Sequence, residues 1–533
     1  MSPSWEDIGP KAQARLLDSI PSEWRVPDDK LPPSSQLDVT SFPAKSGLLS
    51  DHELAITDAL ASDIVAQIAS GTWKAVDVTA AFCKRAAIAH QLTKCLTVIM
   101  FDDAIARAKE LDRQFAETGK TVGPLHGLPI SLKDNFNIIG KTSCVGFTAW
   151  AEEPMQVEST IVGMLRDLGA VAYVKTNVPT AMMIAESVNN TFGRTVNPLN
   201  RNLTSGGSSG GESALIAMHG SPLGIGTDIG GSLRIPSAMT GIWTIRPSYG
   251  RFPHFDARSG MGGQEAVGSV HGPMARSVKD LRLFCEHVSN AGPWLKDPKC
   301  IEMPWRSVTL PEKLKIAVMW DDGIVTPTPP VKRALKEVVE KLKGKGYEIV
   351  EWGPEGHQKA LELIAKFFVA DGGKSVGKIL EVTGEPWRPE MKYYEDAKEI
   401  GVYDLWQLQK ERTALSKMYL DRWAASGGVD AILLPTTPYA SVKHGDFKYI
   451  GYTGVYNVLD YSAVSFPTGL FADEKVDVSP KDHKALSEFD EAANKDYDAA
   501  AVHGIPISLQ LVGRRLQEEK MLDLAERVAK DLD

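Results

Sequence analysis

The sequence has few cysteines, no excess of basic residues and no long apolar run, and each of these absences excludes a class of protein. Five cysteines in 533 residues, with no Cys-x-x-Cys spacing, provide neither a disulfide framework nor a zinc motif. Asp and Glu outnumber Lys and Arg by 68 to 59, a net charge of −9, which argues against a nucleic-acid or acidic-membrane partner. No run reaches the roughly 18 uninterrupted apolar residues of a membrane span.

Low-complexity composition, internal repeats and targeting signals are missing as well. Gly and Pro contribute 46 and 32 residues, well short of the roughly 25–30% that marks low-complexity chains. No period of about 20–50 residues recurs, which excludes solenoids and propellers. The first residues contain no apolar stretch of the ~7–15 residues that a signal peptide needs. We therefore expect a cytoplasmic protein with reduced cysteines, and no histidine–carboxylate spacing predicts a metal site.

The composition that remains, 43% apolar and 24% charged, is that of a globular protein. Helical periodicity begins after the cap-like pair Ser50-Asp51, and short apolar strands alternate with helices further along. The expected elements are helices over 54–68, 76–90, 158–168, 331–342, 405–423 and 516–532, and strands over 171–174, 314–319 and 347–350. Strands separated by helices predict an α/β protein whose sheet is covered on both faces. The first ~45 residues, rich in Pro and Ser around Pro32, are expected to form an arm lying on this body.

The most unusual segment is dense in glycine. Nine of the 26 residues from 206 to 231 are glycine, and Ile225, Ile229 and Leu233 are interleaved with them. A flexible linker lacks such apolar residues. Glycine at this density indicates backbone conformations or close approaches that other residues forbid.

Nucleotide-binding motifs do not fit this glycine pattern. A dinucleotide fingerprint requires Gly-x-Gly-x-x-Gly, whereas Gly224, Gly226 and Gly230 are spaced one residue too widely. A phosphate-binding loop requires a glycine five residues before Gly140, but that position is Asn135. Both readings therefore fail on spacing.

A Ser-His-Asp esterase is a closer rival. Gly206-x-Ser208-x-Gly210 matches the nucleophile elbow of α/β-hydrolases, which must follow a buried strand. The preceding residues 197–204 contain Pro198 and predict a polar loop instead, and no His-Gly-Gly-Gly oxyanion loop is present. With His444 or His503 as base, the esterase stays the weaker alternative.

A lysine base suits the segment better. Lys133 ends a short apolar run that predicts a buried strand end, and burial lowers the pKa of a lysine because it disfavours the ammonium. Reaching the ~7–8 useful for a general base from ~10.4 costs roughly 3–4 kcal/mol. Ser208 and Ser232, each in a glycine turn, offer two hydroxyls for such a base, although the neighbouring Asp134 leaves a plain ion pair open. Asp228 and Arg234 are expected to form a structural ion pair.

Three motifs carry a family resemblance. Lys133 in Gly-Leu-Pro-Ile-Ser-Leu-Lys-Asp, Ser208 in Gly-Gly-Ser-Ser-Gly-Gly-Glu and Ser232 in Gly-Thr-Asp-Ile-Gly-Gly-Ser-Leu-Arg-Ile-Pro resemble the amidase signature family, including the 24-residue separation of the serines. Segments such as 303–306 and 513–516 look like the fungal acetamidases, so the resemblance covers nearly the whole chain. It implies an α/β amidase signature fold: a mixed central β-sheet covered on both faces by helices, in a single compact domain. Residues 71–533 would form this amidase domain, with its signature core at about 123–250, and residues 1–70 an N-terminal arm and helical segment packed on it.

The resemblance also implies roles for individual residues. Ser232 takes the place of the acyl-forming nucleophile, Ser208 that of a bridging serine after a cis peptide bond, and Lys133 that of the base. The other implied site residues are Met182, as a substrate contact, and the backbone amides of Ile229, Gly230, Gly231 and Ser232, as an oxyanion hole.

The implied function is hydrolysis of a carboxylic amide to a carboxylate plus ammonia or an amine, without cofactor or metal. An amide is a poor electrophile, and a covalent intermediate splits its hydrolysis into two easier steps. Small aliphatic or aryl amides are the expected substrates, and a homodimer is left open. The alternatives are an amide-transferring amidotransferase subunit, a hydrolase of larger N-acyl or lipid amides, and a catalytically silent binding protein.

Overall fold

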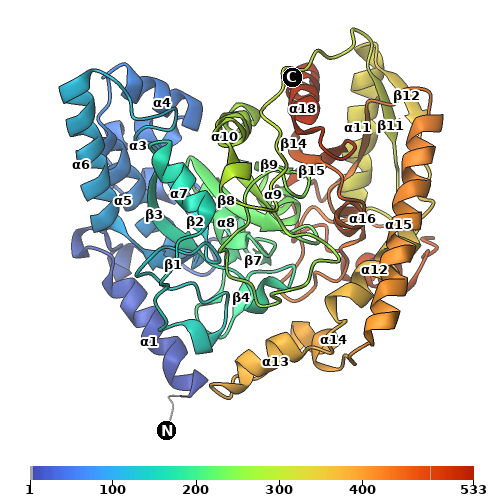
Figure 1. Cartoon of the computed structure of the whole chain (residues 1–533), viewed down its shortest axis with the longest axis horizontal. Helices are drawn as coiled ribbons and strands as arrows, with labels where there is room; N and C mark the ends of the chain where they lie inside the picture. Colours follow the sequence, from blue (N-terminus) through green and yellow to red (C-terminus); the bar gives the residue numbers. More distant parts are fainter. Residues whose placement is uncertain (1–3, 481, 533) are drawn as a thin grey trace.

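One large mixed β-sheet runs through the computed structural model, which describes residues 4–480 and 482–532 (Figure 1). In sheet order its eleven strands are β1 (Leu96–Ile99), β3 (Val171–Thr176), β2 (Pro129–Lys133), β8 (Leu223–Asp228), β10 (Val270–Ala275), β9 (Trp243–Arg246), β14 (Ala463–Phe471), β15 (Pro506–Val512), β13 (Ala431–Pro435), β11 (Lys315–Val318) and β12 (Glu348–Glu351). β2 is parallel to β3 and β8, and β11 is parallel to β12 and β13, whereas the other neighbouring strands are antiparallel. The predicted mixed sheet is confirmed.

Alternate residues of the strands enter two separate cores. In β13, Ala431 and Leu433 join one apolar cluster, whereas Ile432 and Leu434 join the other. This alternation is the period of a strand that is buried on both faces. The sheet is therefore covered on both sides by helices, as the sequence predicts.

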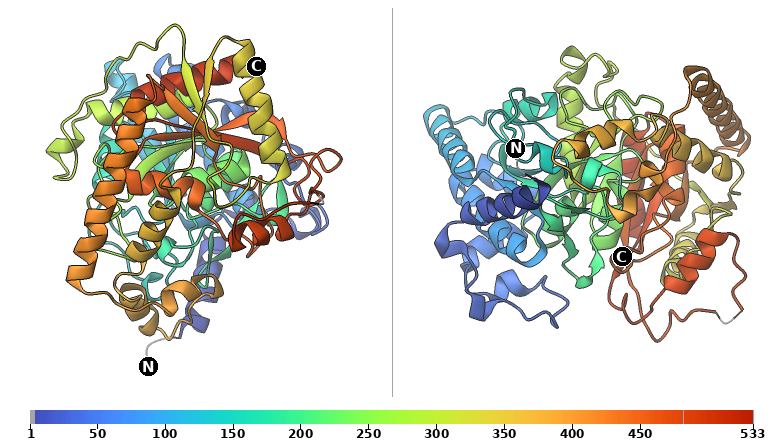
Figure 2. Two further views of the ribbon diagram at one scale, coloured as in Figure 1. Left: turned by 90° about the vertical axis from the view of Figure 1, so that its right-hand side faces the viewer. Right: turned by 90° about the horizontal axis from the view of Figure 1, so that it is seen from below.

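The helices divide between the two faces. Their bounds are α1 (Trp5–Asp18), α2 (Phe42–Lys45), α3 (Asp51–Asp58), α4 (Ala61–Ala69), α5 (Ala75–Thr93), α6 (Phe101–Thr118), α7 (Thr160–Asp167), α8 (Gly210–Ala217), α9 (Arg234–Thr240), α10 (Val278–Asn290), α11 (Pro329–Gly344), α12 (His357–Phe368), α13 (Lys374–Glu381), α14 (Lys392–Glu395), α15 (Val402–Ala425), α16 (Gly451–Leu459), α17 (Glu488–Asp496) and α18 (Glu518–Leu532). The apolar side chains of α5, α10, α11 and α18 enter the first core, and those of α12, α15 and α16 enter the second. In the left view of Figure 2, α15 and α11 accordingly lie on opposite sides of the strands. In the part of the chain that the structure describes, no helix is both long and apolar enough to span a membrane.

The helix expected over 54–68 is wrong in one respect, because it is two helices. α3 ends at Asp58 and α4 begins at Ala61, with Ala59 and Leu60 in extended conformation between them. Arg276 donates to the carbonyls of Thr57 and Asp58 at 3.2 and 3.0 Å, which satisfies the end of α3. Tertiary contacts thus interrupt a periodicity that is continuous in the sequence.

The N-terminal arm contains a helix that the sequence analysis missed. α1 buries Ile8 and Ala12, and the Gln13 amide donates to the Thr191 carbonyl at 2.8 Å. Further along, the Val39 amide donates to the Pro198 carbonyl at 2.9 Å. The arm therefore lies against the body, while a division of the chain at residue 70 stays a prediction.

The segment 197–204 is a small β-ribbon and not the expected polar loop. β6 (Val196–Asn197) pairs with β7 (Asn200–Thr204) outside the main sheet. The Asn197 side chain accepts from the Leu199 amide at 3.0 Å, which forms the turn between the strands. A second ribbon joins β4 (Val188–Asn189) to β5 (Gly193–Arg194). None of these four short strands belongs to the central sheet. Ser208 therefore does not follow a buried strand of that sheet, as a nucleophile elbow requires.

Candidate active site

Lys133 is the last residue of β2, and its side chain is 0% exposed. Because β2 lies between β3 and β8, the end of the strand is enclosed on both edges. The Nζ atom donates to Ser208 Oγ at 2.7 Å and to Thr227 Oγ1 at 2.7 Å. The predicted approach of Lys133 to Ser208 is therefore present. Thr227, on the neighbouring strand β8, is a second contact that the sequence did not reveal.

The environment of Lys133 favours an uncharged amine. Burial lowers its pKa to about 7, against the opposing effects of the Asp228 and Glu212 carboxyl groups. Among the described residues, no carboxylate forms an ion pair with Nζ, so the ammonium form lacks direct compensation. A buried amine whose neighbours are hydroxyl groups can exchange protons with them near neutral pH.

The two serine turns lie against one another. The peptide bond between Gly207 and Ser208 is cis, and the amide of Ser209 donates to the Ser232 carbonyl at 3.2 Å. A Cβ atom at Gly207 would stand 2.6 Å from the backbone nitrogen of Glu186, so only glycine fits. Ser208 contacts Lys133 on one side and lines a cavity together with Ser232 on the other. The three predicted residues are thus brought into one place.

A buried ion pair holds the turn that contains Ser232. Arg234 donates through Nε and Nη2 to the two carboxylate oxygens of Asp228, both at 3.1 Å. Arg234 also donates to Asn457 Oδ1 at 2.7 Å and to Gln510 Oε1 at 3.3 Å. Burial by itself would raise the pKa of Asp228, but Arg234 lowers it to about 2. The expected structural ion pair is confirmed, and it fixes both ends of the turn.

This ion pair also uses one of the four backbone amides proposed for an oxyanion hole. Asp228 Oδ1 accepts from the Gly231 amide at 2.9 Å. In the described ranges, the amides of Ile229, Gly230 and Ser232 have no intramolecular acceptor. Gly231 has φ +131°, and a Cβ there would lie 2.3 Å from the Thr453 hydroxyl oxygen. Gly231 therefore forms the bend of the turn, and the oxyanion hole itself stays a prediction.

The cavity beside Ser232 has a volume of about 320 Å³. Met182, the predicted substrate contact, lines it, and so does Ile229. Other lining residues include Asn135, Met183, His254, Phe255, Arg258, Met261, Gln264, Glu265 and Lys299. The cationic groups are neutralised, since Arg258 pairs with Glu153 at 2.7 Å and Lys299 with Glu265 at 2.5 Å. The cavity therefore offers mostly apolar and neutral polar contacts.

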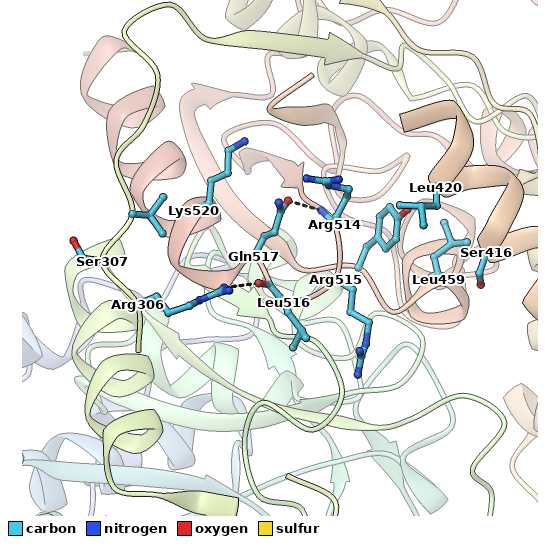
Figure 3. Close-up of a pocket in the computed structure, with 12 residues that line it drawn as sticks. Arg306, Ser307, Ser416, Leu420, Leu459, Arg514, Arg515, Leu516, Gln517 and Lys520 are labelled. Atoms are coloured by element: carbon cyan, nitrogen blue, oxygen red, sulfur yellow. Dashed lines mark hydrogen bonds between the residues drawn. The ribbon is translucent and has the colours of Figure 1, made fainter. Parts of the chain in front are cut away.

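A larger surface hollow of about 760 Å³ contains none of these residues (Figure 3). Three of its four basic side chains form ion pairs: Arg306 with Glu519 at 2.8 Å, Arg515 with Asp460 at 2.6 Å and Lys520 with Asp430 at 2.8 Å. In the described part of the chain, no three His, Cys, Asp or Glu side chains are grouped as a metal ion would require. We therefore place the candidate site at the Ser232 cavity.

The fold is that of the amidase signature enzymes, and comparisons with known proteins agree. A sequence model of the Amidase family matches residues 77–522. The chain therefore belongs to the amidase family and is an amide hydrolase.

Curated relatives and a solved structure are similar over nearly the full length. The acetamidase of Emericella nidulans is 42% identical over 545 residues, covering 99% of this chain and 98% of the relative. The acetamidase of Aspergillus oryzae is 42% identical over 544 residues, covering 99% of each. A structure of fatty acid amide hydrolase superimposes with a TM-score of 0.94 at 36% identity, covering 98% of this chain and 94% of that one.

Proposed function

We propose that the chain hydrolyses small neutral carboxylic amides to a carboxylate plus ammonia or an amine, through an acyl-enzyme on Ser232. The observation that carries this proposal is the 2.7 Å contact between Ser208 and the fully buried Lys133. A cofactor is not needed for this reaction, because each proton transfer has a side chain to perform it.

In the first half of the reaction, neutral Lys133 takes the proton of Ser208 while Ser208 takes that of Ser232. The Ser232 oxygen attacks the amide carbonyl carbon, and the negative charge develops on the carbonyl oxygen. The free amides of Ile229 and Gly230, with that of Ser232 itself, stabilise this oxygen, a contribution of about 3–4 kcal/mol for a single donor in other enzymes.

In the second half, the relay runs in reverse. Lys133 returns its proton through Ser208 to the leaving nitrogen, and the carbon–nitrogen bond breaks to release ammonia or an amine. A water molecule then attacks the acyl carbon while Ser208 and Lys133 accept its proton. The relay returns this proton to Ser232, and the released carboxylic acid gives its remaining proton to solvent and becomes the carboxylate, so the enzyme returns to its starting protonation state.

The cavity supports a small neutral substrate. Met182 and Met261 provide adaptable apolar walls, and the paired Arg258 and Lys299 offer no unpaired cation to a carboxylate substrate. The names of the two acetamidases favour a short acyl group as well.

A hydrolase of long-chain amides is the second candidate, because the protein named fatty acid amide hydrolase has a nearly identical fold at 36% identity. The two candidates are separated by kcat/KM for acetamide, hexanamide, benzamide, an anilide and oleamide. We expect the highest values among the first three, since each methylene changes transition-state binding by about 1–3 kcal/mol. A clear preference for oleamide would overturn the small-amide assignment, whereas ammonia release that requires a second subunit would point to an amidotransferase.

The acyl-enzyme has its own test. Rapid acid quenching during turnover should trap a mass increase equal to the acyl group on the peptide that contains Ser232. The proposal requires one binding partner, the small amide substrate. A homodimer stays a prediction, which light scattering on the purified chain tests.

A further inference from the structure

Glu212 is a fully buried carboxyl group that the proposed reaction does not use. It lies in the first turn of α8, four residues after Ser208, and is 0% exposed. Its Oε2 is 2.5 Å from Ser131 Oγ, and its Oε1 is 2.9 Å from Thr176 Oγ1. A Cβ atom at Gly224 would stand 2.1 Å from Oε2, so the glycine makes room for this carboxyl group. The surrounding residues therefore leave a defined space for the Glu212 carboxyl group.

Counting hydrogen atoms indicates which form Glu212 takes. Ser131 Oγ lies 2.8 Å from Ser221 Oγ, and Ser221 donates to the Leu223 carbonyl at 2.9 Å. Glu212, Ser131, Ser221 and the carbonyl thus form a chain of three contacts. The two serines supply two hydrogens, and a carboxylate supplies none. All three contacts are hydrogen bonds only if Glu212 carries the third hydrogen and donates it to Ser131.

Only the hydroxyl groups of Ser131 and Thr176 and the more distant Lys133 favour a charge on Glu212, against its complete burial. The titratable groups that face it are Lys133 on β2, Tyr173 on β3 and Cys95 before β1. Tyr173 donates its hydroxyl to the Gly220 carbonyl, and burial raises the pKa of Cys95 to about 12. Among the described residues, Glu212 and Lys133 form no ion pair. Two opposite charges that are buried without contact would not recover their loss of hydration.

We propose that Glu212 is a protonated, neutral carboxylic acid in the resting enzyme, and that its neutrality keeps Lys133 uncharged. The second half of this statement rests on the proposed function, in which Lys133 is the base. Glu212 is a positioning residue: it touches neither substrate nor Ser232, and it acts through the electrostatic potential at Lys133. Burial raises the pKa of Glu212 to about 8, against the opposing hydrogen bonds of Ser131 and Thr176, in agreement with this assignment.

Infrared spectroscopy tests the protonation directly. At pH 7 the wild-type protein should show the carbonyl band of a protonated carboxylic acid, and Glu212→Gln should lose that band. Glu519→Gln is the matched control: Glu519 is equally buried but accepts from Arg251 at 2.6 Å and from Arg306 at 2.8 Å, so it is a carboxylate with no such band to lose. A wild-type spectrum without the band, or a band that persists in Glu212→Gln, overturns the proposal.

The pH dependence of kcat/KM tests the effect on Lys133. Glutamine replaces a neutral acid with a neutral amide, so the midpoint of the acid limb should move by less than about half a pH unit in Glu212→Gln. If Glu212 were a carboxylate, its removal would lower the pKa of Lys133, and the midpoint would move down by about half a unit or more. That result overturns the proposal.

Two arrangements keep the test decisive. If Glu212→Gln fails to fold, wild-type protein labelled with ¹³C-glutamate replaces it. The isotope shift of the carbonyl band identifies a protonated glutamic acid at pH 7 without any substitution. A spectrum without an isotope-shifted band overturns the proposal. The infrared band does not depend on catalysis. If Lys133 proves not to be the base, the band still decides the protonation of Glu212, so the two failures are distinguishable.

Discussion

Two fully buried lysines lie on neighbouring parallel strands, and their surroundings differ. Lys133 on β2 and Lys175 on β3 are both 0% exposed, and Lys175 is paired in register with Leu132. Because side chains alternate along a strand, the two ammonium groups enter opposite faces of the sheet. Lys133 contacts the hydroxyls of Ser208 and Thr227, whereas Lys175 lies 4.0 Å from the Asp134 carboxylate and donates to Ser143 at 2.6 Å.

The difference shows that burial does not by itself make a lysine a base. Burial lowers the pKa of both, to about 7 for Lys133 and about 8 for Lys175, where Asp134 opposes it. Lys175 has a carboxylate beside it and no substrate cavity in contact, so its charge has a structural use. Lys133 has hydroxyl groups that lead to the cavity. The partner of a buried amine, more than its depth, determines its role.

The largest expected effect comes from removing Ser232, the hydroxyl group that Lys133 activates through Ser208. Ser232→Ala should lower kcat/KM for acetamide by about 10⁴-fold or more while the fold is retained, because no other oxygen can form the acyl-enzyme. Ammonia release and circular dichroism measure the two effects. Ser259→Ala, at an exposed serine of the same cavity, is the control and should keep most of the activity. Substantial turnover by Ser232→Ala would refute the nucleophile assignment.

Substituting each lysine in turn tests the comparison itself. Lys133→Met should lower kcat/KM by about 10³-fold, since a general base contributes 10²–10⁴-fold. Lys175→Met should keep far more activity but lower the free energy of unfolding by about 3 kcal/mol, because Asp134 is left as an unpaired buried charge. Urea denaturation and steady-state kinetics give both numbers for each variant. The reverse pattern, with Lys175 essential for activity and Lys133 for stability, would contradict our reading of the two faces.

The pH dependence tests a buried lysine as the base without any substitution. A lysine accepts a proton only when neutral, so kcat/KM should rise as pH rises through the pKa of the base and fall below it. With Lys133 as base the midpoint lies near pH 7, below which activity falls about tenfold per unit. A profile without an acid limb between about pH 5 and 9 would contradict a buried lysine as the base. Acetamide is the suitable substrate, because it does not titrate in this range.

The smallest expected effect concerns two further hydroxyl contacts, that of Lys133 with Thr227 and that of Lys175 with Ser143. Thr227→Val keeps the shape of the side chain but removes its contact with Lys133, which should lower kcat/KM by about tenfold, the equivalent of about one hydrogen bond. Thr227→Ser should restore activity. Ser143→Ala removes the corresponding contact of Lys175 and should change kcat/KM by less than about threefold. Equal losses in both variants would show that Thr227 has no special connection with the base.

The sequence predicted which residues meet at the candidate site better than it predicted the residues that support them. Lys133, Ser208 and Ser232 stand in motifs that are recognisable one by one, and the structure brings them together. Thr227 and Glu212 were missed, because their value comes from neighbours 94 and 81 residues away, at Lys133 and Ser131, and a lone threonine or glutamate carries no local signal. The sequence also did not reveal that Asp228 accepts from the Gly231 amide, and the role of Gly231 in an oxyanion hole stays a prediction.

The same holds for the fold: features that depend on neighbouring residues were predicted, and features that depend on distant residues were not. Helices such as α5 and α11 agree with the predicted ranges within a few residues. The order of the eleven strands does not follow from the sequence, because strands such as β9 and β14 are neighbours although more than 200 residues separate them. Such pairings are decided by packing of the whole sheet.

The hydrogen bond between Arg234 and Gln510 has a consequence for how the protein is made. Gln510 lies on β15 and is itself held by the carbonyls of Pro435 and Tyr452, at 3.0 and 2.8 Å. A ribosome that adds about 5–20 residues per second completes the Ser232 turn well before it reaches this glutamine. The Ser232 turn is therefore synthesised early, but the hydrogen bond from Arg234 to Gln510 can form only near the end of synthesis. We expect a chain that stops before β15 to be inactive even where its N-terminal strands have folded, so that hydrolysis begins only when synthesis is almost finished.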